Sequence, residues 1–132
     1  MFVLDSSVVL PACAATDGFE PFGPELVAPP LLASEVLSAL HAAVWRGDVA
    51  VEQAEIALAR FEAGPVRIRS HARLARTAWA MADALGWAKT YDAEFLALAQ
   101  LLGCRLVTSD QRLRRAAAHL GFVMLPSEVT GS

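Results

Sequence analysis

Two aspartates in this chain each follow a short apolar segment that has the character of a buried strand. Asp5 follows a run of Phe, Val and Leu, and Asp110 follows a segment that contains Leu, Val and Thr. If the two strands are parallel neighbours, both aspartates lie at the sheet edge where open α/β sheets bind their ligands. Glu35 and Asp92 add two carboxylates from otherwise apolar helical segments. Four such groups in one place repel one another unless a cation lies between them, so the pattern indicates a metal site.

The predicted site contains only carboxylates, without His or Cys. Hard oxygen ligands of this kind suit Mg²⁺, with Mn²⁺ as a plausible substitute. Mg²⁺ keeps several water molecules when a few carboxylates bind it, and such a water can be ionised for attack on phosphorus. The residues therefore indicate hydrolysis of phosphodiester bonds.

Three of the four carboxylates have an alternative structural role. Asp5 can cap a helix that begins at Ser6, Asp110 can cap a helix that begins at Gln111, and Asp92 lies in the first turn of a helix, where an acid is favourable. Glu35 lies well inside a helix, next to its apolar face, where a charge is costly unless it is paired or bound to metal. Alternatively, Glu35 lies at the boundary of the core and its carboxylate reaches solvent.

Short apolar strands and amphipathic helices alternate along the chain, and this order positions the four carboxylates. Strands are predicted at Val3-Leu4, 26–28, 66–68, 106–108 and 122–125, and helices at 6–15, 31–46, 51–62, 72–85, 91–102 and 111–119, with Thr90 capping the helix from Tyr91. Alternation of this kind predicts a parallel sheet covered by helices on both faces. Residues 1–132 are expected to form one domain, whose last residues, 129–132, fray.

The composition narrows the possible functions, but it does not exclude a nucleic-acid substrate. The formal net charge is −3, but setting aside the four candidate carboxylates leaves ten acidic against eleven basic side chains. Apolar runs are too short for a membrane span and no signal peptide opens the chain, so we expect no membrane association and a cytoplasmic location. The two cysteines have no ligand-like spacing, which disfavours a zinc site or a disulfide framework.

Four segments together resemble the motifs of PIN domains, in order and spacing. They are Val3-Leu4-Asp5-Ser6-Ser7, Ser34-Glu35-Val36, Thr90-Tyr91-Asp92-Ala93 and Val107-Thr108-Ser109-Asp110-Gln111-Arg112-Leu113. The resemblance covers almost the whole chain, and the chain is particularly similar to the VapC toxins of bacterial type II toxin–antitoxin pairs.

This resemblance implies a three-layer α/β/α sandwich with a central five-stranded parallel sheet. It also implies a Mg²⁺-dependent endoribonuclease that acts on RNA and is paired with a small, VapB-like antitoxin. The family's acidic residues fall on Asp5, Glu35, Asp92 and Asp110. Ser6 and Thr108 match polar positions that often support these ligands.

Basic and apolar surfaces suggest further partners. Arg112, two residues after Asp110, is the arginine best placed to hold an RNA phosphate, whereas most other arginines suit solvated helix faces. The helices 31–46 and 51–62 carry more apolar surface than a small sheet needs. That excess indicates a partner groove or a homodimer face, with core packing as the competing explanation.

Three other functions fit parts of the pattern. A receiver-like signalling module also collects acids at a sheet edge, but it needs a lysine late in the chain, and the only lysine, Lys89, precedes a helix. A PIN-fold protein with no catalytic role is disfavoured by the intact acidic set. A nuclease of RNA processing, or one that acts on DNA, keeps the same chemistry without a toxin role.

Overall fold

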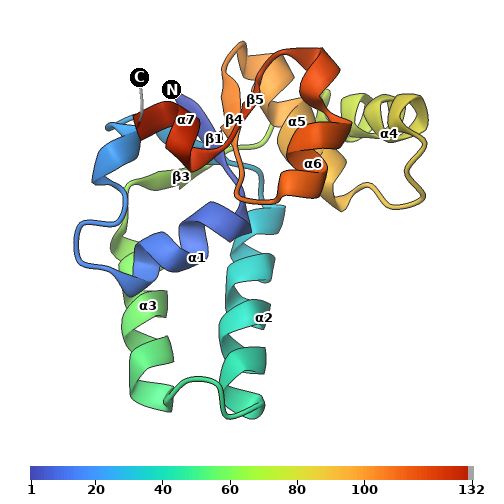
Figure 1. The fold of residues 1–132 in the computed structure, drawn as a ribbon. Helices are drawn as coiled ribbons and strands as arrows, with labels where there is room; N and C mark the ends of the chain where they lie inside the picture. The colour runs from blue at the N-terminus through green and yellow to red at the C-terminus, as the bar shows by residue number, and fades with distance from the viewer. Residues whose placement is uncertain (131–132) are drawn as a thin grey trace.

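A computed structural model describes residues 1–130 of the chain. Its centre is a five-stranded sheet with the order β3-β2-β1-β4-β5, in which all paired strands are parallel (Figure 1). The strands are β1 (Phe2–Leu4), β2 (Leu26–Ala28), β3 (Val66–Ile68), β4 (Arg105–Val107) and β5 (Val123–Met124). The prediction of a five-stranded parallel sheet is confirmed.

Within residues 1–130, seven α-helices surround this sheet. They are α1 (Ser6–Ala14), α2 (Leu31–Trp45), α3 (Val51–Ala63), α4 (Leu74–Leu85), α5 (Tyr91–Leu102), α6 (Gln111–Ala116) and α7 (Pro126–Thr130). Helices α1, α2 and α3 pack on one another, whereas α4 packs on α5, which lies against β1 and β4. Figure 1 shows these two groups on different sides of the sheet, as the predicted three-layer α/β/α sandwich requires.

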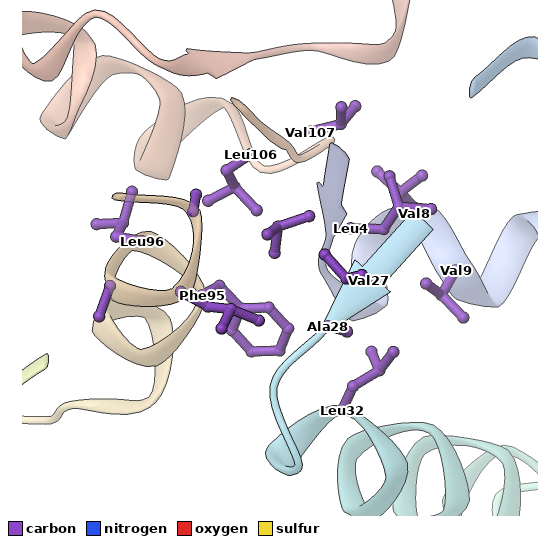
Figure 2. Packing of buried hydrophobic residues seen from close by; sticks show 14 of the residues in the cluster. Leu4, Val8, Val9, Val27, Ala28, Leu32, Phe95, Leu96, Leu106 and Val107 are labelled. Atoms are coloured by element: carbon purple, nitrogen blue, oxygen red, sulfur yellow. The ribbon is translucent and has the colours of Figure 1, made fainter. Parts of the chain in front are cut away.

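The core is most continuous between the central strands and α5. Leu4, Leu106 and Val107 are fully buried, because strands of a parallel sheet are covered on both faces. Figure 2 shows Phe95 of α5 projecting toward this layer. The alanines of α5 that lie among them let the helix approach the sheet closely.

Helices α2 and α3 extend together away from the sheet as a hairpin (Figure 1). Gly47 has a φ of 79° in the turn after α2, where its amide N donates to the carbonyl O of Val44 at 3.0 Å. Trp45 is 85% exposed near the end of the hairpin, so core packing does not explain this residue. Phe61 of α3, by contrast, does pack against the core.

Several predicted boundaries differ from the observed ones. Helix α4 begins at Leu74 rather than at residue 72, and the helix predicted over 111–119 is divided into α6 and a 3₁₀ turn at Ala118–Leu120. Thr90 occupies the N-cap position of α5, but its side chain makes no capping hydrogen bond. Glu20–Phe22, which lies outside the predicted helices and strands, forms a 3₁₀ turn.

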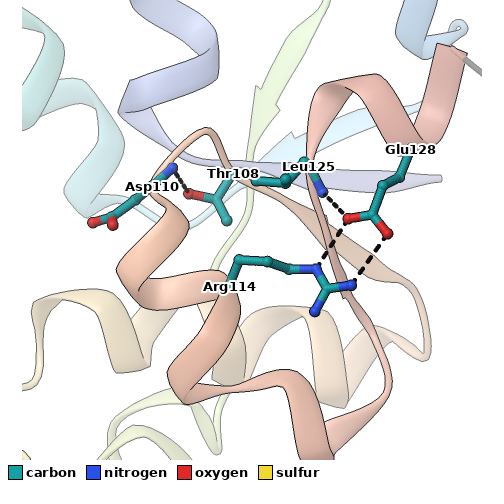
Figure 3. A network of polar contacts seen from close by, with 5 residues as sticks. All are labelled: Thr108, Asp110, Arg114, Leu125 and Glu128. Atoms are coloured by element: carbon teal, nitrogen blue, oxygen red, sulfur yellow. Dashed lines mark hydrogen bonds and ion pairs between the residues drawn. The ribbon is translucent and has the colours of Figure 1, made fainter.

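Helix α7 is a feature that the sequence analysis missed. No helix is predicted beyond residue 119, whereas the fixed φ of Pro126 starts this helix. The Arg114 guanidinium donates to both carboxylate oxygens of Glu128 at 3.0 and 3.1 Å, and Glu128 also accepts the Leu125 N–H at 2.9 Å (Figure 3). Residue 129 therefore lies in a helix instead of a fraying end, and residues 131–132 lie outside the described part of the chain.

Replacing Phe95, which is 1% exposed, tests the role of α5 in the core. Phe95→Ala is expected to lower the free energy of unfolding by about 3–5 kcal/mol, because it leaves a cavity between α5 and the sheet. Urea denaturation followed by circular dichroism measures this loss. Gln100→Ala, an exposed change on the same helix, should stay within about 0.5 kcal/mol of the parent. Equal midpoints for the two variants would contradict the packing described here.

Candidate functional site

The pairing of β1 with β4 brings two of the predicted site residues to one sheet edge. Leu4 lies opposite Val107 in the register, and the Asp5 amide N donates to the Val107 carbonyl O at 3.4 Å. Asp5 and Thr108 thus leave neighbouring strands at the same level. Asp110 follows two residues later and caps α6.

Asp5 is the most buried of the four carboxylates, with 7% of its surface exposed. It is the N-cap of α1, and its Oδ1 accepts hydrogen bonds from both the amide N and the hydroxyl of Ser7. Burial raises the pKa of Asp5, and the Ser7 and Thr108 side chains, which favour the ionised form, oppose this shift. The charge of Asp92 raises it further, so these two carboxylates are within electrostatic reach of each other.

Asp110 is held by the start of α6. Its Oδ1 accepts the N–H groups of Arg112 at 2.9 Å and Leu113 at 3.2 Å, and its own N–H donates to Thr108 Oγ1 at 3.1 Å. In Figure 3 the Asp110 carboxylate points away from the Arg114–Glu128 pair. Both capping bonds end on Oδ1, which leaves Oδ2 available to another partner.

A cleft of about 720 Å³ opens beside this edge of the sheet. Three of the predicted carboxylates line it, together with Arg112, the α4–α5 connection and the start of α5. The lining residues are Glu35, Gly86, Trp87, Ala88, Lys89, Tyr91, Asp92, Asp110, Arg112, Leu113 and Ala116.

Glu35 lies in the second turn of α2, and its carboxylate is partly buried. Its Oε1 has no contact with solvent and no hydrogen-bond partner among the described residues. Desolvation raises the pKa of Glu35 to about 7, and the charges of Asp5, Asp92 and Glu94 add to this shift, while the Ser6 side chain opposes it. A buried carboxylate oxygen without a partner is costly, so Glu35 holds a position that a bound group would stabilise.

Asp92 connects Asp110 to the other carboxylates. Partial desolvation raises its pKa, the charge of Asp110 raises it further, and the positive charge of Arg112 opposes both. Asp92 in turn acts on Asp5 and on Glu35. All four predicted carboxylates therefore belong to one network of mutual repulsion.

The side chains near the cleft can be compared with the ligands that a divalent cation needs. No group of three or more His, Cys, Asp or Glu side chains within residues 1–130 is arranged to hold a metal ion. Mg²⁺ does not need such a group, because one or two carboxylates commonly bind it while water fills its other positions. The all-oxygen donor set and the unpartnered Oε1 of Glu35 fit this mode of binding.

Ser7 is a supporting residue that the sequence analysis missed in favour of its neighbour Ser6. Its hydroxyl donates to Asp5, accepts the Ser109 N–H at 2.8 Å and lies 3.3 Å from Thr108 Oγ1. Ser6 instead acts on Glu35. The signal was the position of Ser7 two residues after a capping aspartate, from which a hydroxyl can return to the cap.

The fold and the cleft define a class of parallel α/β proteins with a cluster of acidic residues at the carboxyl edge of the sheet. The family model of the PIN domain matches residues 2–119. The chain belongs to the PIN domain family, whose members are generally metal-dependent nucleases that act on nucleic acid.

Comparison with solved structures supports the same fold. The chain is similar to the crystal structure of PAE2754 from Pyrobaculum aerophilum, with a TM-score of 0.79 and 19% sequence identity over 98% of this chain and 92% of that chain. No curated protein matches the chain at a significant level. Among residues 1–130, no helix has the length and apolar character that crossing a membrane requires.

The raised pKa of Glu35 predicts a pH-dependent stability for the protein in EDTA. Since the folded pKa is about 7 and the ordinary value is 4.5, the folded protein holds this proton more tightly, and stability falls as the pH rises between these values. Glu35→Gln removes the charge, so at pH 8 it should raise the Tm by roughly 3–5 °C, and the gain should vanish near pH 4.5. Thermal melts across this pH range measure the difference.

An exposed glutamate of α3, Glu55, provides the control for this measurement. Glu55→Gln should leave the Tm of the parent nearly unchanged at each pH. If the Tm difference between Glu35→Gln and the parent is the same at every pH, the raised pKa of Glu35 is contradicted.

The hydroxyl of Ser7 is expected to support both the fold and cation binding. Ser7→Ala should lower the free energy of unfolding by about 1–3 kcal/mol, because Asp5 loses a charge-assisted hydrogen bond. It should also weaken Mn²⁺ binding, measured by titration calorimetry, by roughly 10- to 100-fold. Ser109→Ala, which keeps the backbone N–H that Ser7 accepts, should do neither. The same Mn²⁺ affinity in both variants would rule out this supporting role.

Proposed function

We propose that the chain is a Mg²⁺-dependent endoribonuclease that hydrolyses RNA phosphodiester bonds at the cleft. The observation that carries this proposal is Glu35, whose buried and unpartnered oxygen lies within electrostatic reach of Asp5 and Asp92. A cation offsets repulsion of this kind better than any hydrogen bond that the neighbouring side chains supply.

In this proposal Asp5, Asp92 and Asp110 hold the ion, and Glu35 either binds it or orients the attacking water. When bound, Mg²⁺ supplies a Lewis acid that stabilises negative charge on a phosphoryl oxygen and makes water more acidic. The hydrogen bonds to Asp5 and Asp110 fix both carboxylates before substrate arrives. That fixation removes the cost of ordering them during the reaction.

Arg112 is proposed to bind a phosphate of the substrate. It lines the cleft, and its charge is felt by Asp92. Guanidinium groups form paired hydrogen bonds with phosphate oxygens, which fixes the orientation of the bound group. Arg114 is less suited to this role, because it is engaged with Glu128.

We further propose that this nuclease is the toxin of a toxin–antitoxin pair. The α2–α3 hairpin exposes Leu37, Trp45 and Ile56, and apolar grooves run beside it. A segment of a small antitoxin or a second copy of the chain would bury this surface. A small DNA-binding protein encoded directly upstream would support the toxin role, and its absence would favour a nuclease of RNA processing.

Replacing Asp5 tests the proposed chemistry while keeping the fold. Asp5→Asn retains an N-cap of similar strength for α1 but removes the charge that would hold the ion. Cleavage of a labelled RNA by the purified variant should fall roughly 100-fold or more, and EDTA should abolish cleavage by the parent. Asp17→Asn, an exposed change in the loop after α1, should cleave at the parental rate. Undiminished cleavage by a folded Asp5→Asn protein would overturn the assignment.

A further inference from the structure

The connection between α4 and α5 forms one wall of the cleft and carries an unusual set of side chains. Trp87 and Lys89 come from this connection, and Tyr91 is the first residue of α5, directly before Asp92. All three line the same cleft as Glu35 and Asp110. The carboxylates alone do not explain why two aromatic rings and a lysine lie beside them.

The backbone holds Trp87 firmly at this wall. Gly86 has a φ of 73° and ends α4, and the Trp87 amide N donates to the Ala82 carbonyl O at 2.9 Å. A helix end of this kind fixes the residue that follows the glycine. Trp87 is partly buried against the core and also lines the cleft. Little conformational entropy remains to be lost when a flat group binds on it.

Tyr91 offers a second ring to the same space. It is 57% exposed, although the helix that it begins is otherwise the most buried of the fold. A single exposed aromatic residue is ordinary on a protein surface. The half-buried Trp87 and the exposed Tyr91 lie on one cleft wall, four residues apart and with a lysine between them. Together they form a surface suited to flat apolar groups that carry negative charge.

The charges of the cleft indicate which flat group this is. Lys89 and Arg112 bring two positive charges to a cleft that otherwise carries carboxylates, and neither forms an ion pair within residues 1–130. Cations that have no ion pair among these residues, set beside two aromatic rings, match a chain of phosphates with attached bases.

We infer that Trp87 and Tyr91 form a nucleobase subsite of this cleft, on which unpaired bases next to the scissile phosphate stack, while Lys89 binds an adjacent phosphate. This inference rests on the proposed ribonuclease function and adds to it the residues that position the substrate. Stacking tolerates any base, so the subsite selects bases free of a duplex rather than a sequence.

The test measures binding of a short 5′-labelled oligouridylate in Ca²⁺, with gels to verify that the strand stays intact. Trp87→Ala and Tyr91→Ala should each weaken binding roughly 5- to 100-fold, the range expected for one stacked base. Trp87→Phe should bind within a few-fold of the parent, because a ring remains. Trp79→Ala removes an exposed indole that lies outside the cleft and should bind as the parent does.

Two further readouts separate stacking from a general loss of structure. Binding should quench the fluorescence of the parent, and this quenching should be largely absent from Trp87→Phe although that variant still binds. An abasic ribose-phosphate chain of the same length should bind the parent more weakly than oligouridylate does, and Trp87→Ala should show a smaller difference between the two strands.

The outcomes also distinguish this inference from the proposed function. If the parent cleaves and binds RNA but Trp87→Ala and Tyr91→Ala bind as tightly as Trp79→Ala, the subsite is wrong and the nuclease assignment stands. Equal affinity of the parent for oligouridylate and the abasic chain overturns the subsite as well. If the parent neither binds nor cleaves RNA, both proposals fail.

Discussion

The parallel pairing of β1 with β4 is the constraint on which the rest of this molecule depends. It sets Leu4 opposite Val107, so β1 and β4 end at the same level of the sheet, and an aspartate follows the end of each strand. Each aspartate then starts a helix, so the local demand for a cap and the collection of charge are met by the same side chains. Without this register the capping residues would be unrelated features of two distant segments.

At this edge of the sheet, the hydrogen bonds that stabilise the fold are opposed by the repulsion among the acidic side chains. Capping hydrogen bonds hold the carboxylates of Asp5 and Asp110 in place, whereas burial and mutual repulsion raise the pKa of Asp5, Glu35 and Asp92. Glu35 carries the largest unrelieved cost, because its Oε1 lacks any partner among the described residues. Buried polar groups that persist without partners are more typical of functional sites than of purely structural ones.

The sequence predicted the features that local rules control. Apolar runs that end on Asp5 and Asp110, and helices with clear periodicity, led to the parallel sheet and to most of the helix positions. Helix α7 escaped prediction because a tertiary contact, the bond of Arg114 to Glu128, helps to hold five residues that have little helical signal of their own. The roles of Ser6 and Ser7 could not be separated either, since rotation by one helical position decides which hydroxyl meets Asp5. Trp87 and Tyr91 join the cleft only through the packing of α4 on α5, which no local pattern encodes.

The α2–α3 hairpin also has a mechanical consequence. Glu35 lies near the fixed end of α2, and Trp45 lies ten residues further along, about 15 Å away at the rise of an α-helix. Val36 and Leu32 anchor the first turns in the core, whereas the far end is largely free of it. A small tilt about the anchored turns therefore displaces Trp45 through a long arc and Glu35 through a short one. The outer end of the hairpin can therefore shift to fit a contact, while Glu35, beside the anchored turns of α2, keeps its position next to the sheet.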